Sequence, residues 1–314
     1  MIYTLTANPA IDYHMDLSAS GLQPGEINRS VREEMFPGGK GLNVSVILSV
    51  LGIDNTAWGF TAGKTGDLLE ALAAEKGCRC DFIRIPEGET RINVKLDCAQ
   101  ETAVNGNGPA IGPEQINALL DRVRQLEAGD TLILSGKLQA GTVNLYEAVC
   151  REMVGRKIRL IVDTEGEDLK RTFAYHPFLI KPNEEELLAL YQGSDSSRDG
   201  IVALMKNCHN DGVKNVLVTL GGAGALLLTE TGELYQAVIS GEYEILSTVG
   251  AGDSTIAGFL AGMIRYGDQH EEEALALACA AGTATACRQW LAGRQEIESL
   301  TDHIRVSRLQ GERL

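Results

Sequence analysis

Residues 249–260, VGAGDSTIAGFL, place a carboxylate directly after a glycine-rich turn. Gly250, Ala251 and Gly252 leave the backbone bare, so that successive N–H groups can converge on an anion at the positive end of a following helix. Asp253 falls in the first turn of that helix and could accept a proton from an attacking hydroxyl, although an ordinary aspartate pKa of about 3.9 would make it a weak base. This arrangement is typical of phosphoryl transfer, in which positioning and charge stabilisation supply most of the rate. The alternative is an N-cap aspartate after a tight turn, without a catalytic role.

A second glycine-rich turn occupies residues 38–45, GGKGLNVS, and continues into an apolar helix. Gly38 and Gly39 allow the backbone to approach a ligand, and Lys40 and Asn43 add side-chain donors. This second turn favours the catalytic interpretation of the first.

Together the two turns resemble the paired signatures of the ribokinase-like phosphosugar kinases, in the expected order and about two hundred residues apart. The opening TLTANPAIDYH and the segment KPNEEEL at 181–187 resemble the branch that contains 1-phosphofructokinase and tagatose-6-phosphate kinase. The resemblance covers nearly the whole chain. It implies a ribokinase-like three-layer αβα sandwich with a small β-sheet lid. It also implies ATP-dependent phosphorylation of D-fructose 1-phosphate to fructose 1,6-bisphosphate, with tagatose 6-phosphate as the alternative substrate.

On the sugar side, the resemblance assigns Asp12 and Asn43 to the sugar hydroxyls and Arg91 to the phosphate already on the substrate, with Lys40 assisting. A planar bidentate donor suits that phosphate better than a lysine does. Without the resemblance, Asp12 would be interpreted as a turn residue and Arg91 as a solvated arginine on an edge strand. Asn107, in the glycine turn NGNGPA, is also expected to reach the sugar.

One loop departs from the family pattern. Related enzymes carry SGSLPPG or a close variant, whereas residues 135–141 are SGKLQAG. Lys137 therefore replaces a small hydroxyl residue beside the expected sugar site. It is expected to add a phosphate contact or to alter which sugar fits.

On the nucleotide side, residues 219–224, TLGGAG, end a strand and turn under glycines. The motif is neither a Walker loop nor a dinucleotide-binding fingerprint, and a simple β-turn is the alternative. We expect Thr219, Gly221, Gly222 and Gly224 to approach the nucleotide.

The segment KPNEEE, residues 181–186, resembles the KPNxxE element of the family. This resemblance assigns Lys181 and Asn183 to the nucleotide, and Asn183 and Glu186 to Mg²⁺ through water. Magnesium keeps several waters, so few direct protein ligands are needed. An N-cap asparagine followed by first-turn glutamates is an equally good helix start, and both interpretations can hold together.

The elements that position these residues follow a regular pattern. Short Val/Ile/Leu segments alternate with amphipathic ones, which predicts a mostly parallel sheet with helices on both faces. Residues 1–314 are expected to form a single kinase domain. Residues 11–36 and 81–104 break the pattern, and the resemblance implies that their strands form the lid and a surface for a homodimer. The expected strands are 2–6, 56–60, 131–134, 158–162, 178–180 and 215–220, and the expected helices are 43–51, 65–76, 113–124, 142–154, 183–191, 198–208, 252–265 and 271–287.

The composition, with 44% hydrophobic and 23% charged residues, is that of a globular enzyme. A net charge of −15 disfavours nucleic acid and anionic membranes as partners. The N-terminus lacks the features of a signal peptide, so a cytoplasmic location is expected. The seven cysteines lack metal or redox spacing and are expected to be free thiols. A noncatalytic sugar-phosphate sensor on the same scaffold remains the alternative from another class.

Overall fold

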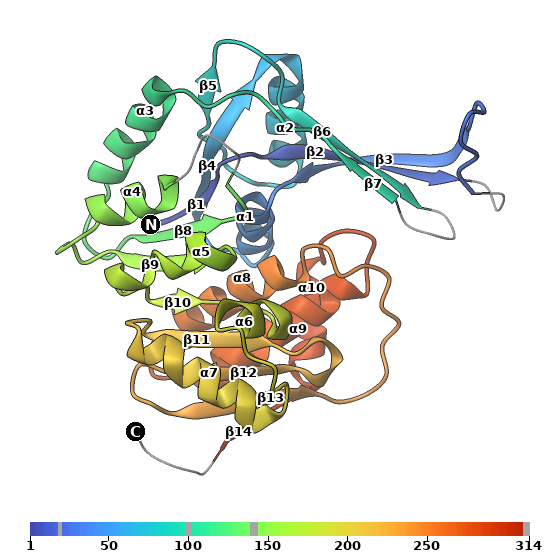
Figure 1. The fold of residues 1–314 in the computed structure, drawn as a ribbon. Helices are drawn as coiled ribbons and strands as arrows, with labels where there is room; N and C mark the ends of the chain where they lie inside the picture. The colour runs from blue at the N-terminus through green and yellow to red at the C-terminus, as the bar shows by residue number, and fades with distance from the viewer. Residues whose placement is uncertain (18–20, 98–101, 139–143, 310–314) are drawn as a thin grey trace.

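The computed structural model describes residues 1–17, 21–97, 102–138 and 144–309 (Figure 1). Cys98 and the loop residues 139–141 of the sequence analysis lie outside these ranges. No helix in the described ranges is long and apolar enough to span a membrane. The six described cysteines are free thiols, as predicted.

The large sheet combines a parallel part with an antiparallel edge. Neighbouring strands are parallel from β5 to β11, and antiparallel from β11 to β14. The parallel strands are short and buried, as expected where helices cover both faces. In spatial order the strands are β14 (Ile304–Arg308), β13 (Leu234–Ile239), β12 (Ala225–Leu228), β11 (Asn215–Thr219), β10 (Leu179–Ile180), β9 (Arg159–Asp163), β8 (Thr131–Ser135), β1 (Ile2–Thr6), β4 (Asn55–Ala62) and β5 (Ile83–Ile85).

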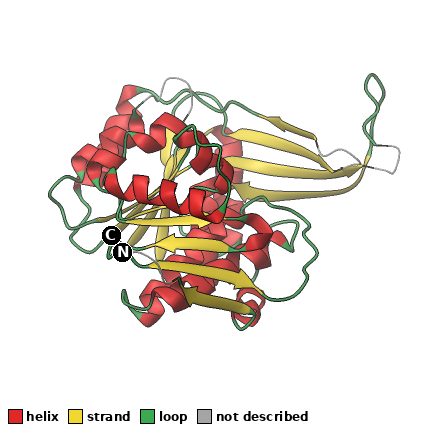
Figure 2. Cartoon of the chain, turned by 60° about the horizontal axis from the view of Figure 1, so that its bottom comes forward, coloured by secondary structure: helices red, strands yellow, loops and turns green. Residues whose placement is uncertain are grey.

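Helices cover both faces of this sheet, which confirms the predicted three-layer sandwich (Figure 2). One buried cluster joins the sheet to α3 (Pro113–Arg124), α4 (Leu145–Glu152), α5 (Gly166–Lys170), α6 (Glu184–Leu190) and α7 (Arg198–Asn210). The cluster on the other face includes α1 (Lys40–Val50), α8 (Ala251–Tyr266), α9 (Glu271–Ala286) and α10 (Arg294–Thr301). A third cluster joins α1 and α2 (Gly63–Glu75) to the base of the small sheet. Short 3₁₀ turns occupy Phe173–Tyr175 and Gly221–Ala223.

The small sheet projects from the body as an arm (Figure 1). It has the order β3 (Ser30–Gly38), β2 (Ala10–Leu17), β6 (Arg91–Asp97) and β7 (Thr102–Asn105). The two central strands are parallel, and their register places Asp12 opposite Asn93. Within the segment 81–104, which was assigned to the lid as a whole, β5 pairs with β4 in the large sheet instead. The first strand of that segment thus extends the large sheet, and only the later two belong to the arm.

Candidate active site

A cleft of about 1430 Å³ runs past the carboxyl ends of the parallel strands, where ligands of open α/β sheets bind. Both glycine-rich turns, the inner face of the small sheet and the turn after β11 line it. Every site residue predicted from the sequence lines this cleft except Gly38. Gly38 lies behind the side chain of Asp12 and leaves room for it, because a Cβ at this position would stand 2.5 Å from Oδ2 of Asp12.

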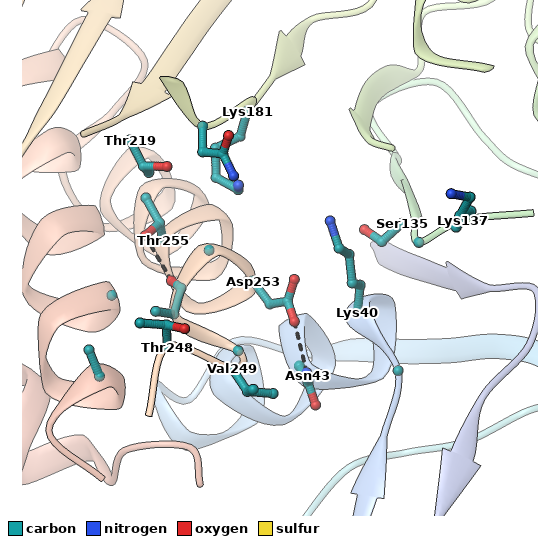
Figure 3. Close-up of a pocket in the computed structure, with 18 of the residues that line it drawn as sticks. Lys40, Asn43, Ser135, Lys137, Lys181, Thr219, Thr248, Val249, Asp253 and Thr255 are labelled. Carbon is teal, nitrogen blue, oxygen red and sulfur yellow. Dashed lines mark hydrogen bonds between the residues drawn. The ribbon is translucent and has the colours of Figure 1, made fainter. Parts of the chain in front are cut away.

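The N-terminus of α8 forms the centre of the cleft (Figure 3). Gly250 caps the helix with a φ of 78°, a conformation that favours glycine. Within the described chain, the N–H groups of Gly252 and Asp253 have no protein acceptor. These two groups and the helix dipole make a site for an anion, as the sequence predicts.

Asp253 is buried, and its Oδ2 accepts a hydrogen bond of 2.8 Å from Nδ2 of Asn43 (Figure 3). Burial and the nearby Asp163 raise the pKa of Asp253 to about 6, against the opposing effects of Lys40, Asn43 and Lys181. The ordinary pKa assumed from the sequence is therefore wrong. Tertiary burial makes this carboxylate a stronger base, while it stays mostly ionised at neutral pH.

Asp163 is a buried carboxylate that the sequence analysis missed. It ends β9, and its two oxygens lie 3.4 Å from Nζ of Lys40 and 3.5 Å from Nζ of Lys181. Burial disfavours the charge of Lys40, but the attraction of Asp163 and Asp253 outweighs it and raises the pKa of Lys40. Asp163 thus holds two ammonium groups beside the anion site, and Lys181 also approaches Gly252, where a Cβ would stand 2.9 Å from Nζ. A carboxylate at the end of a buried strand was the available signal.

One end of the cleft, where the sugar is predicted to bind, is built on the small sheet. Asp12 accepts a hydrogen bond of 2.8 Å from Nδ2 of Asn93 and lies 3.7 Å from the ammonium of Lys95. All three side chains are buried. Nε of Arg91 donates to the carbonyl of Asn8 at 3.1 Å, and burial lowers the pKa of Arg91 against the attraction of Asp12. The sequence analysis missed Asn93 and Lys95, although the period of two along β6 puts them on the face of Arg91.

Several buried polar atoms of the cleft have no hydrogen-bond partner. Within the described residues they are Oδ1 of Asn43, Oδ1 of Asn93 and Oγ of Ser135, and all three residues line the cleft. Buried polar atoms without partners are rare in native proteins, so these three call for a ligand that donates and accepts hydrogen bonds. A sugar with several hydroxyls meets that requirement.

Two other predicted sugar residues lie at the rim. The carbonyl of Asn107 accepts a hydrogen bond of 3.0 Å from Nδ2 of Asn8, which fixes the NGNG turn beside the cleft. The side chain of Lys137 is 78% exposed, and its ammonium pairs with Glu165 at 2.9 Å. A substrate phosphate would have to compete with that carboxylate for Lys137.

The other end of the cleft is less polar. Thr219 and the glycine turn after β11, which are predicted to approach the nucleotide, form one wall of this end, and Gly224 adopts a φ of 93° there. The opposite wall comes from Tyr243, Ile245 and residues of α9 such as Thr283. The sequence analysis missed that wall because its residues carry no motif. A largely apolar lining beside an anion site suits a purine nucleotide.

Asn183 and Glu186 form a capping box at the start of α6. The side chain of Asn183 accepts from the N–H of Glu186, whose Oε2 accepts in turn from the N–H of Asn183 at 2.9 Å. The helix-start interpretation is thus confirmed. No cluster of three His, Cys, Asp or Glu that could hold a metal occurs in the described ranges. The capping box uses Oε2 of Glu186 and not Oε1, and both Asn183 and Glu186 line the cleft. These two residues therefore fit a magnesium ion that keeps most of its waters.

An αβα sandwich with a buried carboxylate at a helix N-terminus and a polar cleft beside it fits a phosphotransferase with an alcohol acceptor. Residues 5–292 match the model of the pfkB family carbohydrate kinases, and the chain belongs to this family. It is similar to the 1-phosphofructokinase of Bacillus subtilis, with 34% identity over 98% of this chain and 100% of the relative. It is 33% identical to the D-tagatose-1-phosphate kinase of Bacillus licheniformis over 98% of this chain and 100% of that one. The structure of phosphofructokinase-2 from Escherichia coli in complex with fructose-6-phosphate aligns with a TM-score of 0.86 and 27% identity, over 96% of this chain and 98% of that one. Membership of a sugar kinase family implies ATP as the co-substrate.

Proposed function

We propose that this kinase transfers the γ-phosphoryl group of ATP to the 6-hydroxyl of D-fructose 1-phosphate, which yields fructose 1,6-bisphosphate. The observation that carries the proposal is the layout of the cleft. A buried carboxylate at a helix N-terminus faces one end, and a half-buried arginine and a buried lysine lie with hydroxyl-binding groups at the other. The names of the similar enzymes support a ketose that already carries a phosphate.

In the proposed mechanism, Arg91 and Lys95 bind the 1-phosphate, while Asp12, Asn93 and Asn43 bind the sugar hydroxyls. Lys40, expected from the sequence to assist with the 1-phosphate, pairs with Asp163 beside the anion site and acts on the transferred group instead. Arg91 offers two parallel donors to the phosphate, and Lys95 offers a point charge. The reactive hydroxyl then lies at the Asp253 end of the cleft. Binding of the nonreacting phosphate thereby orients the reacting oxygen.

Asp253 acts as the general base through Oδ1, because Oδ2 is occupied by Asn43. A bond forms between the 6-oxygen of the sugar and the γ-phosphorus, the bond from that phosphorus to the β–γ bridging oxygen breaks, and the hydroxyl proton moves to Asp253. The free N–H groups of Gly252 and Asp253, with Lys40 and Lys181, stabilise the charge on the transferred group, whereas the N–H of Ala251 is taken by the carbonyl of Thr248. A base with a pKa near 6 is better matched to this task than an ordinary aspartate.

We propose that Mg²⁺ accompanies the triphosphate and is held through water by Asn183 and Glu186. The ion would neutralise phosphate charge that the protein does not reach. Thr219, Gly221, Gly222 and Gly224 would lie along the nucleotide. The small sheet would serve as a lid over the sugar and as the contact surface of a homodimer, and the enzyme would work in the cytoplasm.

A coupled ADP-release assay with ATP, Mg²⁺ and a panel of phosphosugars tests the proposal. We expect kcat/KM for fructose 1-phosphate to exceed that for tagatose 6-phosphate, fructose 6-phosphate and D-tagatose 1-phosphate by at least about tenfold, or roughly 1.4 kcal/mol. Preference for another sugar would overturn the substrate but not the kinase. Absence of turnover with every sugar would favour a sugar-phosphate sensor.

A further inference from the structure

The segment of residues 285–292, which runs from the last two residues of α9 towards α10, touches the N-terminus of α8 on one side. Oγ1 of Thr285 lies 2.8 Å from Oγ of Ser254 in the first turns of α8, and it also accepts from the N–H of Ala292 at 3.3 Å. Leu291 packs against the helix cap, where a Cβ at Gly250 would stand 2.6 Å from its Cδ2. The segment is thus fastened to the N-terminus of α8.

The same segment touches the arm on its other side. The ring of Trp290 stacks on Phe36 of β3, with centroids 4.9 Å apart and an interplanar angle of 9°. The ammonium of Lys76 lies 5.0 Å from the centroid of Trp290 and 5.8 Å from that of Phe36. Beside this stack, Arg32 of β3 donates to Oε1 of Gln289 at 3.0 Å. Stacking and cation–π contacts of this kind hold two surfaces in one geometry.

Phe36 is directly opposite Asp12 in the register of β2 and β3. The position of β3 therefore sets the position of the carboxylate that faces the sugar. Two residues further along the same strand, Gly38 provides the space that the Asp12 carboxylate occupies. The stack thus joins the strand pair that carries a sugar ligand to the segment that carries the helix cap.

We propose that Trp290 is a positioning residue, which fixes the arm through Phe36 and so holds Asp12 at a set place relative to the N-terminus of α8. Neither Trp290 nor Phe36 lines the cleft, so both act through position and not through contact with a substrate. We expect them to affect sugar binding, because the stack contacts β3, the strand paired with that of Asp12, and not the wall formed by the turn after β11.

Steady-state kinetics of Trp290→Ala, Trp290→Phe and Phe36→Leu test this inference, which rests on the proposed function for its sugar substrate. We expect Trp290→Ala to raise the KM for fructose 1-phosphate about tenfold and to leave the KM for ATP within about twofold, in keeping with loss of one stacked pair. Trp290→Phe, which keeps a stacking ring, should retain most of the affinity. The double variant of Trp290→Ala and Phe36→Leu should be no worse than either single one. A rise in both KM values together, or no rescue by phenylalanine, would overturn the role.

A spectroscopic measurement keeps the test independent of the stability of Trp290→Ala. The chain has two tryptophans and eight tyrosines, so Trp58→Phe leaves Trp290 as the single tryptophan, which is excited selectively at wavelengths where tyrosine does not absorb, and it serves as the matched control for tryptophan loss. Adding Phe36→Leu to this variant should shift the emission of Trp290 to longer wavelength and increase its quenching by acrylamide. An unchanged spectrum would show that the stack does not exist in solution and would overturn the inference. If the unmodified enzyme prefers another phosphosugar, the proposed substrate fails, and the KM comparison is made with the preferred sugar.

Discussion

Replacement of Asp253 by asparagine separates a catalytic carboxylate from a structural one, because its effects on turnover and stability have opposite signs. Burial raises the pKa of Asp253 from 3.8 to about 6. The native protein therefore binds this proton more tightly than the unfolded chain does. The stability contributed by this group is fully present below pH 3.8 and is lost as the pH rises through 6. At pH 7.5 the native enzyme carries the full cost of a buried charge.

The shift of about 2 pKa units corresponds to about 3 kcal/mol of unfolding free energy. Asparagine carries no charge, so Asp253→Asn should remove that cost. For a chain of 314 residues this amounts to a rise in Tm of about 5 °C at pH 7.5. At pH 4 the native carboxyl is already protonated, and the difference in Tm should largely vanish. Turnover should fall by about 10²-fold or more, with little change in binding of either substrate.

Differential scanning calorimetry at the two pH values and the ADP-release assay check both effects on the same preparations. The unmodified enzyme should also lose about tenfold in kcat/KM between pH 8 and pH 5, because about one tenth of a carboxyl with a pKa near 6 is ionised at pH 5. A lower Tm for Asp253→Asn at pH 7.5, or near-normal turnover, would refute the assignment of Asp253 as a buried base.

Three further substitutions test the two ends of the cleft by steady-state kinetics. Arg91→Ala should raise the KM for the phosphosugar at least about tenfold and spare the KM for ATP, since it removes a charged contact to the nonreacting phosphate; a rise in the ATP KM alone would reverse the orientation of the site. Lys137→Ser should raise the phosphosugar KM about two- to fivefold with an unchanged ATP KM, because an exposed lysine that also pairs with Glu165 adds little to phosphate affinity. Wild-type kinetics on every sugar would mean that Lys137 pairs with Glu165 and does not contact the substrate. Gly252→Ala should lower kcat about tenfold at nearly unchanged Tm, because its Cβ would displace the Lys181 ammonium that lies 2.9 Å away; unchanged kcat would remove Lys181 from the transition state.

The elements predicted from hydrophobic periodicity agree with the structure to within a few residues where connections are local. Helix α3 has the predicted bounds, α8 extends one residue beyond its prediction at each end, and α9 begins at the predicted residue and ends one residue earlier. The antiparallel edge was missed. Strand β14 pairs with β13, although α8, α9 and α10 lie between the two strands in the sequence. No local pattern predicts so distant a partner. Strand β5 was assigned to the lid because its sequence of three residues does not indicate that it pairs with β4.

For the site, the sequence by itself determined the two glycine-rich helix starts and their nearby side chains. Backbone conformation and the exposure of N–H groups depend on adjacent residues, so the turn before Asp253 could be predicted as an anion site and the turn around Lys40 as a place where the backbone approaches a ligand. The resemblance to a family then implied how a sugar and a nucleotide would be divided between them.

Only the tertiary structure decided the electrostatics and the shape of the site. Asp163 joins Lys40 to Lys181 through space, and Asn93 and Lys95 reach Asp12 through a parallel pairing of strands far apart in the chain. The pKa of Asp253 follows from burial by elements that are distant in sequence. Desolvation and Coulomb interactions depend on which groups surround a charge and not on which residues precede it, so the strength of the base became visible only in the folded chain.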